Sequence, residues 1–405
     1  MNILVLDEWL PSVRNSGKSI RTFELLAPLA KRHRITYLAH LDGQPDHARK
    51  MEAAGFEVIC VPRRKAYGSI PAILFGAVPA LFDRLPISVR RHFSPDYAAA
   101  ARKLVAERTF DLVHIEWSHY AVYLPFVRPL PTFVCTHNVE FLSWRRFVQA
   151  TRNPAKKILG IHEAAKLYRF EKESYRRVDR LSVVSEDDAV LVRREFDIDD
   201  VCVIPNGVDI TAYDAVPNAP KPNHLVYCGS MDAFINQDAV AYFIEKIFPL
   251  ILKRKPEAVL TVIGRHPPPW LLALQSERIR FTGAVADVRQ PLKEGTLEVV
   301  PLRIGGGSRL KILEAFAAKV PVLSTTIGAE GLAVEHNKNI VLADVPEDFA
   351  DRCVELLDDP LRRNRLVEEG RRTVDEQYDW SRISPLVENA WTQTIETAKV
   401  RRSPR

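Results

Sequence analysis

The sequence predicts an α/β protein built from two doubly wound domains. Short β-rich runs alternate with amphipathic helical stretches, and this alternation occurs twice, once on each side of a polar, proline-rich stretch that begins near residue 205. Strands that alternate with helices form parallel sheets, because each crossover helix returns the chain to the same end of the sheet. A chain of 405 residues is also longer than one hydrophobic core usually supports, which favours two domains.

The first domain is expected over residues 1–205. Apolar residues recur at three- and four-residue spacing over Ser19–His33, which predicts a helix after the first strand. Strands are predicted over Ile3–Leu6, Ile35–Ala39, Glu57–Val61, Leu112–Glu116, Thr132–Thr136 and Arg180–Ser185, and further helices over Tyr97–Arg108 and Lys156–Arg177.

A linker is expected over residues 206–222, where turn residues and three prolines interrupt the periodicity. The second domain is then expected over residues 223–380. Ligands of doubly wound folds bind at the carboxyl ends of the strands, so two such domains facing each other are expected to leave a ligand cleft. Strands are predicted over Leu225–Cys228, Val259–Ile263, Ile279–Phe281, Leu297–Pro301, Val322–Ser324 and Ile340–Leu342, and helices over Asp238–Arg254, Ser308–Lys319 and from about Pro346 onward.

Charge is distributed unevenly along the chain. Residues 1–180 hold 29 Lys and Arg against 17 Asp and Glu, a balance of +12, and residues 181–405 hold 28 against 34, a balance of −6, which together give the net +6. A basic first half is either an ordinary solvated surface or a site of attraction to anionic lipid or a phosphorylated acceptor. Basic stripes interleaved with aromatic residues are not found, so nucleic acid is not an expected partner.

The cysteine pattern and the apolar segments favour a cytoplasmic protein without a metal. The five cysteines are scattered and never spaced as Cys-x-x-Cys, which predicts reduced thiols and neither a zinc site nor a disulfide framework. Met1 leads directly into an apolar strand, so no signal peptide is expected. The apolar run from Ile70 to Phe82 is broken by two prolines and is shorter than the roughly 20 residues that a membrane span needs.

The strongest local motif is the segment Pro301 to Ala315, which contains Gly305-Gly306-Gly307-Ser308 at a predicted strand-to-helix junction. Glycines let backbone N–H groups approach a ligand closely, and a helix N-terminus favours negative charge. Three cations, Arg303, Arg309 and Lys311, add positive charge beside this junction, which is the chemistry that a diphosphate requires. The alternative is a capped surface helix with an ordinary Lys311–Glu314 pair.

Weaker motifs lie at other predicted strand ends. Gly17 precedes the first helix, where it would let the backbone approach a phosphate, although a loop glycine at such a place is also common in structural turns. His137 follows a buried strand and could donate a hydrogen bond to a sugar hydroxyl, although a strand-end histidine is more often structural. Glu330-Gly331 lies in a loop where a carboxylate could bind hydroxyls or be merely solvated.

Taken in order, these motifs resemble the retaining GT-B glycosyltransferases of glycosyltransferase family 4 (glycosyl transferases group 1). The resemblance runs over nearly the whole chain and is most specific in Gly305–Ala315. It implies two Rossmann-like domains, the first on the acceptor side and the second on the donor side, with residues 381–405 forming a helix that crosses back to the first domain and a basic tail. The other segments that carry it are Thr136-His137-Asn138, Val183–Asp187, Ile204–Asp209, Tyr227–Asp232, Val262–Gly264, Phe281–Gly283, Pro321-Val322 and Gly328–Leu332.

The resemblance implies a role for each matching residue. Gly17 would lie beside the donor diphosphate, His137 would contact the transferred sugar, and Arg309 and Lys311 would neutralise the diphosphate. Glu314 would hold the ribose hydroxyls, and Glu330 with Gly331 would lie near the nucleotide or the sugar. Arg303 and the loop Gly305-Gly306-Gly307-Ser308 are expected to complete the donor site.

The chain departs from the family pattern in two places. Gly306 stands where the first of a pair of glutamates is usual, and the segment Gly229–Phe234 lacks the usual cations after the first strand of the second domain. We therefore expect Arg309 and Lys311 to have taken over the compensation of the diphosphate charge.

The resemblance implies metal-free transfer of a sugar, with retention, from a nucleotide-diphosphate sugar to a glycan or lipid-linked acceptor in polysaccharide or cell-envelope synthesis. No cofactor is expected. The protein would be cytoplasmic or peripheral on the inner face of the plasma membrane, with an anionic membrane surface as a further partner. A nucleotide-sugar epimerase of the same build, and a non-catalytic donor-binding scaffold within a polysaccharide assembly complex, are the alternatives.

Overall fold

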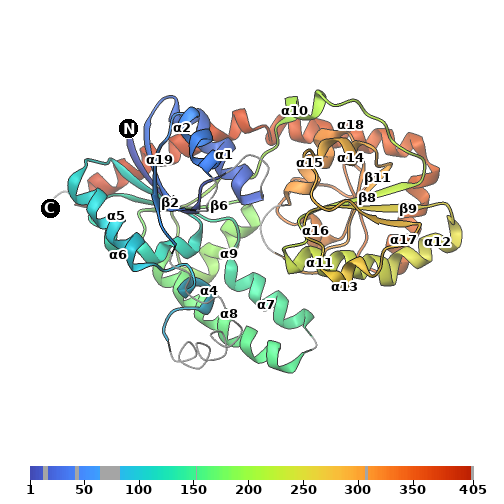
Figure 1. Ribbon diagram of the computed structural model, residues 1–405, viewed down its shortest axis with the longest axis horizontal. Helices are drawn as coiled ribbons and strands as arrows, with labels where there is room; N and C mark the ends of the chain where they lie inside the picture. Colours follow the sequence, from blue (N-terminus) through green and yellow to red (C-terminus); the bar gives the residue numbers. More distant parts are fainter. Residues whose placement is uncertain (12–16, 42–44, 64–82, 152, 306–308, 403–405) are drawn as a thin grey trace. The chain divides into compact units, whose positions relative to one another are not determined.

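The computed structural model describes residues 1–11, 17–41, 45–63, 83–151, 153–305 and 309–402, which form two compact units (Figure 1). Unit 1 comprises Met1–Pro205 and Ile383–Arg405, and unit 2 comprises Asn206–Arg382. The last helix, α19 (Trp380–Arg402), therefore belongs largely to unit 1 although it follows unit 2 in sequence. The stretch from Ile70 to Phe82 lies outside the described residues.

Unit 1 is built on a sheet of seven parallel strands in the order β3-β2-β1-β4-β5-β6-β7. The strand order reverses between β1 and β4, and ligands of doubly wound folds bind beside such a switch point. The strands are β1 (Asn2–Trp9), β2 (Arg34–His40), β3 (Glu57–Val61), β4 (Leu112–Glu116), β5 (Thr132–Cys135), β6 (Arg180–Val183) and β7 (Val201–Val203).

Helices cover both faces of this sheet (Figure 1). Their starts are fixed by local chemistry: Ser94 and Ser185 accept backbone N–H groups as N-caps of α5 and α9, and Pro95 occupies the first turn of α5. The helices are α1 (Gly17–Ala30), α2 (Pro45–Ala53), α4 (Ile87–Arg90), α5 (Pro95–Glu107), η1 (Ser118–Tyr123), α6 (Leu124–Val127), α7 (Glu140–Ala150), α8 (Pro154–Tyr175), α9 (Glu186–Phe196) and α19.

Unit 2 repeats the same plan with six parallel strands in the order β10-β9-β8-β11-β12-β13, and its switch point lies between β8 and β11. The strands are β8 (His224–Cys228), β9 (Val259–Ile263), β10 (Ile279–Phe281), β11 (Leu297–Val300), β12 (Val322–Ser324) and β13 (Val341–Leu342). The helices are α10 (Ile210–Asp214), α11 (Phe234–Tyr242), the π-turn η2 (Phe243–Ile247), α12 (Phe248–Arg254), α13 (Pro269–Leu272), α14 (Arg289–Lys293), α15 (Leu310–Ala318), α16 (Thr326–Ala329), α17 (Pro346–Asp358) and α18 (Pro360–Gln377).

The predicted α/β class with two parallel sheets is confirmed, and several details differ, among them helix α10 within the predicted linker. Strand β7 was not predicted because three residues at a sheet edge carry little pattern. The helix expected from Asp238 begins at Phe234 and contains the π-turn η2. The helix expected from Ser308 begins at Leu310, with Arg309 as its N-cap residue. None of the described helices is long and apolar enough to cross a bilayer.

Candidate active site

The predicted glycine loop of unit 2 leaves the carboxyl end of β11 and runs through Gly305 toward α15. Gly305 has a φ of +146°, and a Cβ atom at this position would lie 2.3 Å from Nη2 of Arg309. The Arg309 guanidinium therefore lies directly against the Gly305 backbone, an approach that only glycine permits. Gly306, Gly307 and Ser308, which were also predicted to bind the donor, lie outside the described residues.

Lys311, in the first turn of α15, is held at a fixed place. Its Nζ donates to the Tyr227 hydroxyl at 2.7 Å and to Oδ1 of Asn236 at 3.0 Å, and it lies 4.0 Å from the centre of the Tyr227 ring. Tyr227 belongs to β8 and Asn236 to the first turn of α11, so the amine is held between α11 and β8, one of the two strands that flank the switch point of unit 2. Asn236 in turn donates to the carbonyl of Ser230 at 2.8 Å and so orders the loop that follows β8.

Two carboxyl groups accompany this amine. Glu298 on β11 is completely buried, and Glu314 lies one turn after Lys311 against the Tyr213 hydroxyl. Burial raises the pKa of Glu298 to about 8 and that of Glu314 to about 7, while burial lowers the pKa of Lys311 to about 8 in spite of the attraction of Glu298. An approaching anion would thus find a cation whose charge is sensitive to pH near neutrality.

Sequence reasoning missed Glu298, although a signal was present. It is the one carboxylate in the otherwise apolar run Leu297-Glu-Val-Val-Pro301, and a charged residue in a central strand is buried only where it has a partner. Lys311 attracts the Glu298 carboxyl through its charge and not through a hydrogen bond, and this neighbour could be identified only from the packing of α15.

Arg303 differs from the other two predicted cations. Its guanidinium contacts Asp238 of α11 at 2.6 and 3.2 Å and lies 4.2 Å from the centre of the Tyr242 ring. The charge of Arg303 is therefore already opposed by a carboxylate, and the side chain is exposed at the rim of the loop.

The loop that carries Glu330 lies beside the glycine loop. Thr325 donates through Oγ1 to the carbonyl of Leu302 at 2.5 Å, and β11 and β12 are parallel neighbours. Glu330 is the C-cap residue of α16, and Gly331 has a φ of +78°, the left-handed region that favours glycine. The structure thus brings Arg303, Gly305, Glu330 and Gly331 to one edge of the sheet of unit 2.

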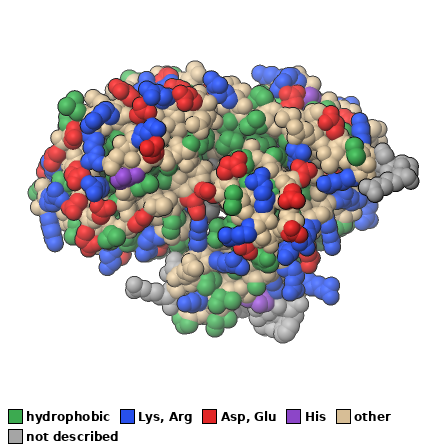
Figure 2. Space-filling view, turned by 180° about the vertical axis from the view of Figure 1, so that it is seen from behind, with side chains coloured by type: hydrophobic (Ala, Val, Ile, Leu, Met, Phe, Trp, Pro, Cys, Tyr) green, Lys and Arg blue, Asp and Glu red, His purple; other side chains and the backbone are tan. Residues whose placement is uncertain are grey.

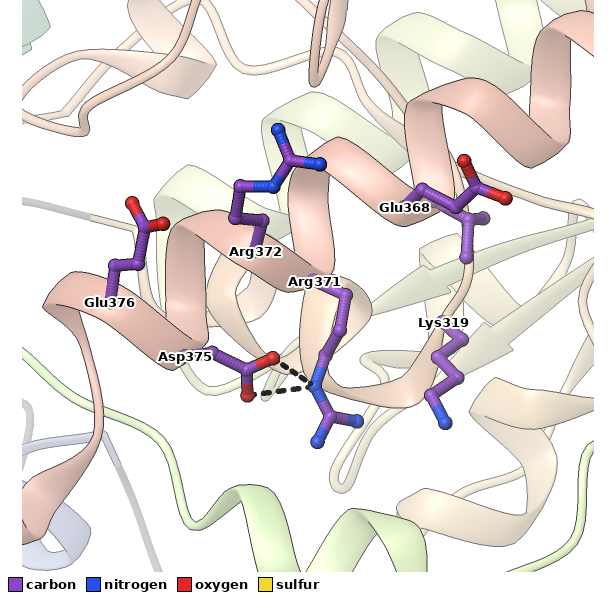
Figure 3. A pocket seen from close by; sticks show the side chains of 7 residues that line it. Lys319, Glu368, Arg371, Arg372, Asp375 and Glu376 are labelled. Carbon is purple, nitrogen blue, oxygen red and sulfur yellow. Dashed lines mark hydrogen bonds and ion pairs between the residues drawn. The ribbon is translucent and has the colours of Figure 1, made fainter.

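A hollow of about 440 Å³ elsewhere in unit 2 is lined mainly by α18 (Figure 3). It is crossed by ion pairs: Arg371 contacts Asp214 of α10 at 2.7 Å and Asp375 at 2.9 Å, and Lys319 lies 3.4 Å from Asp214. The hydrogen bond from Arg371 lowers the pKa of Asp214 to about 2. These pairs join α10 and α18 to the end of α15, and none of the predicted site residues lines the hollow.

In unit 1 the predicted His137 follows β5 and contacts a buried carboxylate. Its Nε2 lies 2.8 Å from Oε1 of Glu116, the last residue of β4. The other oxygen of Glu116 lies 2.7 Å from Nε2 of His114, whose Nδ1 accepts the indole N–H of Trp391 at 3.1 Å. A continuous set of contacts therefore runs from α19 through β4 to His137.

The charge states of Glu116 and His137 follow from these contacts. Hydrogen bonds from His114 and His137 hold the pKa of Glu116 well below its usual value despite burial, so this carboxylate is ionised. Burial lowers the pKa of His137 although Glu116 opposes the effect, so the ring is neutral near pH 7. Because a carboxylate only accepts, the single proton of His137 is assigned to Nε2 and the basic lone pair to Nδ1.

Sequence reasoning missed Glu116 and His114 as well. They alternate in the strand Leu-Val-His114-Ile-Glu116, so both side chains lie on one face of the sheet, a polar pair in an apolar run. Ligand atoms of His114, Glu116 and Cys135 lie within 4.8 Å of one another, close enough for a metal. Both ring nitrogens of His114 already have hydrogen-bonding partners, and we therefore interpret the group as a polar network.

Gly17, the other predicted residue of unit 1, is the exposed first residue of α1. The next residue, Lys18, contacts the Asp7 carboxylate, and Arg21 donates to the carbonyls of Ile204 and Pro205 at 2.7 and 2.6 Å. The first turns of α1 are thus tied both to the end of β1 and to the last residues of unit 1.

Both parts of the chain match models of sugar-transferring families. Residues 16–212 match the model described as Glycosyltransferase Family 4, and residues 222–359 match the model described as Glycosyl transferases group 1. Together the two glycosyltransferase models match most of the chain. The Thr136-His137-Asn138 strand end lies within the first match, and the glycine loop with Arg309, Lys311 and Glu314 lies within the second.

Curated relatives match over part of their length. A GDP-mannose-dependent alpha-(1-6)-phosphatidylinositol monomannoside mannosyltransferase of Mycobacterium tuberculosis is 30% identical over 34% of this chain and 40% of its own. An uncharacterised 44.6 kDa protein in the cps region of Klebsiella pneumoniae is 19% identical over 61% of this chain and 65% of its own. The chain thus spans between two fifths and two thirds of the length of these relatives.

Solved structures share the whole fold. Sucrose-phosphate synthase of Thermosynechococcus elongatus superposes with a TM-score of 0.71 at 16% identity, covering 97% of this chain and 98% of that one. HepE of Anabaena, in complex with UDP-glucose, superposes with a TM-score of 0.69 at 15% identity, covering 97% and 100%. The fold is therefore GT-B.

Proposed function

We propose that the protein transfers a sugar from a nucleoside-diphosphate sugar to an acceptor. The observation that carries the proposal is the position of Lys311, whose amine is fixed by Tyr227 and Asn236 at the switch point of unit 2. Residues Gly229–Phe234 supply no cation after β8. A cation from α15 thus stands beside the first turn of α11, where charge compensation for a diphosphate would otherwise be missing.

Arg309 supplies the second charge in this proposal. Its guanidinium lies on the Gly305 backbone at the start of α15, where the helix N-terminus also favours an anion. Glu314 would accept hydrogen bonds from the ribose, and Glu330 with Gly331 would contact the nucleotide or the sugar. Arg303, already paired with Asp238, would act at the rim of the site.

In unit 1, Gly17 would lie beside the diphosphate and His137 would contact the transferred sugar. The ionised Glu116 supports this role because it keeps the proton of His137 on Nε2. We further propose transfer with retention, as the family resemblance implies, and without a metal, because Arg309, Lys311 and the start of α15 would compensate the charge that develops on the departing diphosphate.

The relatives support a donor class and an acceptor class. A relative named for GDP-mannose and a structural neighbour solved with UDP-glucose support guanosine and uridine as candidate bases beside adenosine, and the same relative, named for phosphatidylinositol monomannoside, supports a lipid-linked acceptor. We place the reaction in polysaccharide or cell-envelope synthesis at the cytoplasmic side, with a glycan or lipid-linked acceptor.

A binding screen followed by a turnover assay tests the proposal. UDP, GDP and ADP are each added to the full chain, and one of them should raise the free energy of unfolding by about 2.7 kcal/mol at a hundredfold excess over its Kd. The matching nucleotide sugars are then incubated with and without candidate acceptors. Release of the diphosphate that depends on an acceptor supports transfer, and an isomerised sugar without an acceptor supports the epimerase. Binding without turnover would support the scaffold.

A further inference from the structure

The hairpin of α7 and α8 in unit 1 exposes an apolar stripe at its tip. Ile158, Leu159 and Ile161 are 71%, 43% and 54% exposed, and neighbouring exposed apolar side chains mark interaction sites more often than isolated ones do. The two helices run side by side at the edge of unit 1 (Figure 1), and α7 packs against the start of α8.

The packing of the hairpin explains which face is left open. Gly160 is buried, and a Cβ atom there would lie 2.7 Å from Cγ2 of Val148, so α8 uses its Gly160 face to contact α7. Residues 154, 158, 161 and 165 follow one another at four- and three-residue spacing on the opposite face, and all four are exposed. They are Pro, Ile, Ile and Ala, and these make the exposed face of the first three turns apolar.

The charge of the hairpin is mostly positive toward its tip. Residues 141–169 contain seven Lys and Arg and one carboxylate, Glu163. Glu163 is buried and accepts the backbone N–H groups of Ile87 and Ser88 at 2.9 and 2.8 Å, so its charge is used to hold α4 against α8. Lys156 and Lys157 are exposed beside the apolar stripe. In Figure 2 hydrophobic side chains gather with Lys and Arg side chains at the bottom of the view, where the hairpin lies.

We propose that the tip of this hairpin, defined by Pro154–Ile161, docks on an anionic lipid bilayer, with Ile158 and Ile161 inserted among the acyl chains and Lys156 and Lys157 at the lipid headgroups. An apolar stripe flanked by cations and free of exposed acidic residues is complementary to such a surface. A second copy of the chain would bring the same positive charges together, which disfavours self-association through this face.

Liposome flotation of the full chain tests the proposal. Vesicles of phosphatidylcholine are compared with vesicles that also contain phosphatidylglycerol. We expect the wild-type protein to float with the anionic vesicles and not with the neutral ones. The double variant Ile158→Ser with Ile161→Ser should reduce the bound fraction about tenfold, because the inserted apolar area is lost. The double variant Lys156→Glu with Lys157→Glu should reduce it at least as much and abolish the salt dependence of binding.

Matched controls carry the same substitutions at exposed positions elsewhere. Val190→Ser with Leu361→Ser replaces apolar side chains that are 59% and 74% exposed, and Lys246→Glu with Lys253→Glu changes the charge equally on an exposed part of unit 2. These controls should float like the wild type. Every variant should also show the thermal shift that the nucleoside diphosphate causes in the wild type. A loss of membrane binding with this shift intact separates the present proposal from that of sugar transfer.

Three results would overturn the proposal. The first is a wild-type protein that stays at the bottom of the gradient or floats equally with neutral vesicles. The second is a pair of hairpin variants that float like their controls. The third is a change in molar mass by light scattering when Ile158 and Ile161 are replaced, since this would assign the face to a second copy of the chain.

Discussion

The Nζ of Lys311 donates a hydrogen bond to the hydroxyl of Tyr227 across 2.7 Å, which ties the first turn of α15 to β8. Replacement of Tyr227 by Phe removes this hydrogen bond and keeps the ring. We expect the nucleoside diphosphate to bind roughly fivefold more weakly, since one such bond contributes about 1 kcal/mol. Titration calorimetry measures the change. Tyr242→Phe is the matched control, because the ring of Tyr242 contacts Arg303 and not Lys311; equal losses in both variants would contradict the assignment.

Diphosphate binding should depend on pH in a way that is unusual for a lysine. Burial lowers the pKa of Lys311 to about 8, so its charge is present below that value and is lost as the pH rises through it. We expect affinity to fall by up to about tenfold per pH unit above 8. The Lys311→Arg variant stays charged, so its affinity should fall less steeply between pH 7 and 9, where only the ionisation of Glu298 and Glu314 remains. A wild-type profile as flat as that of the variant would show that Lys311 keeps an ordinary pKa.

Arg309 and Arg303 should differ in their contribution to turnover. Arg309→Ala removes the guanidinium that lies on Gly305, and a loss of about 10²–10³ in kcat is typical when one transition-state group is removed. Arg303→Ala should cost less, because its charge is already opposed by Asp238. Steady-state rates measured with a single donor compare the loss of kcat in the two variants. Near-normal turnover of both Arg309→Ala and Lys311→Ala, with intact circular dichroism, would remove the proposed mechanism.

Glu116 should act on the reaction through His137. Glu116→Gln replaces an acceptor-only group by an amide that can also donate, so the proton of His137 is no longer fixed on Nε2. We expect kcat to fall by about 10² with little change in the donor KM, since the ring is presented in the wrong tautomer. Thr22→Val is the control, because it removes only the 3.1 Å hydrogen bond from Thr22 to the same carboxylate. A comparable fall of kcat in that control would assign the effect to general loss of packing.

Trp391 should stabilise unit 1 from the C-terminal helix. It is completely buried and donates its indole N–H to Nδ1 of His114, so Trp391→Phe leaves that nitrogen without its donor. We expect the free energy of unfolding to fall by about 1–3 kcal/mol. Denaturant unfolding measures the change, and Leu386→Ala on the exposed part of the same helix should stay within about 0.5 kcal/mol. If the two variants lost the same stability, the contact with His114 would contribute nothing measurable.

Periodicity and turn chemistry were enough to predict most of the fold. The strands Glu57–Val61, Leu112–Glu116, Val259–Ile263 and Val322–Ser324 were predicted with their observed bounds, because a buried parallel strand is a continuous apolar run that turn residues interrupt. The start of α15 was misplaced by two residues. Ser308 carries the stronger capping signal, whereas the observed N-cap residue is Arg309, whose side chain lies against Gly305.

The sequence by itself determined the α/β class, the two parallel sheets and the cations of the glycine loop, since these follow from local pattern and from short segments of the chain. Only the tertiary structure decided which side chains act together. Glu116 meets His137 because β4 and β5 are neighbours in the sheet, and Lys311 meets Tyr227 because the fold of unit 2 brings the first turn of α15 to the end of β8. The two residues of the first pair are 21 apart in sequence and those of the second are 84 apart. A charged side chain can be buried only beside an opposite charge or a hydrogen-bonding group, and this requirement selects the partner among the many that the sequence offers.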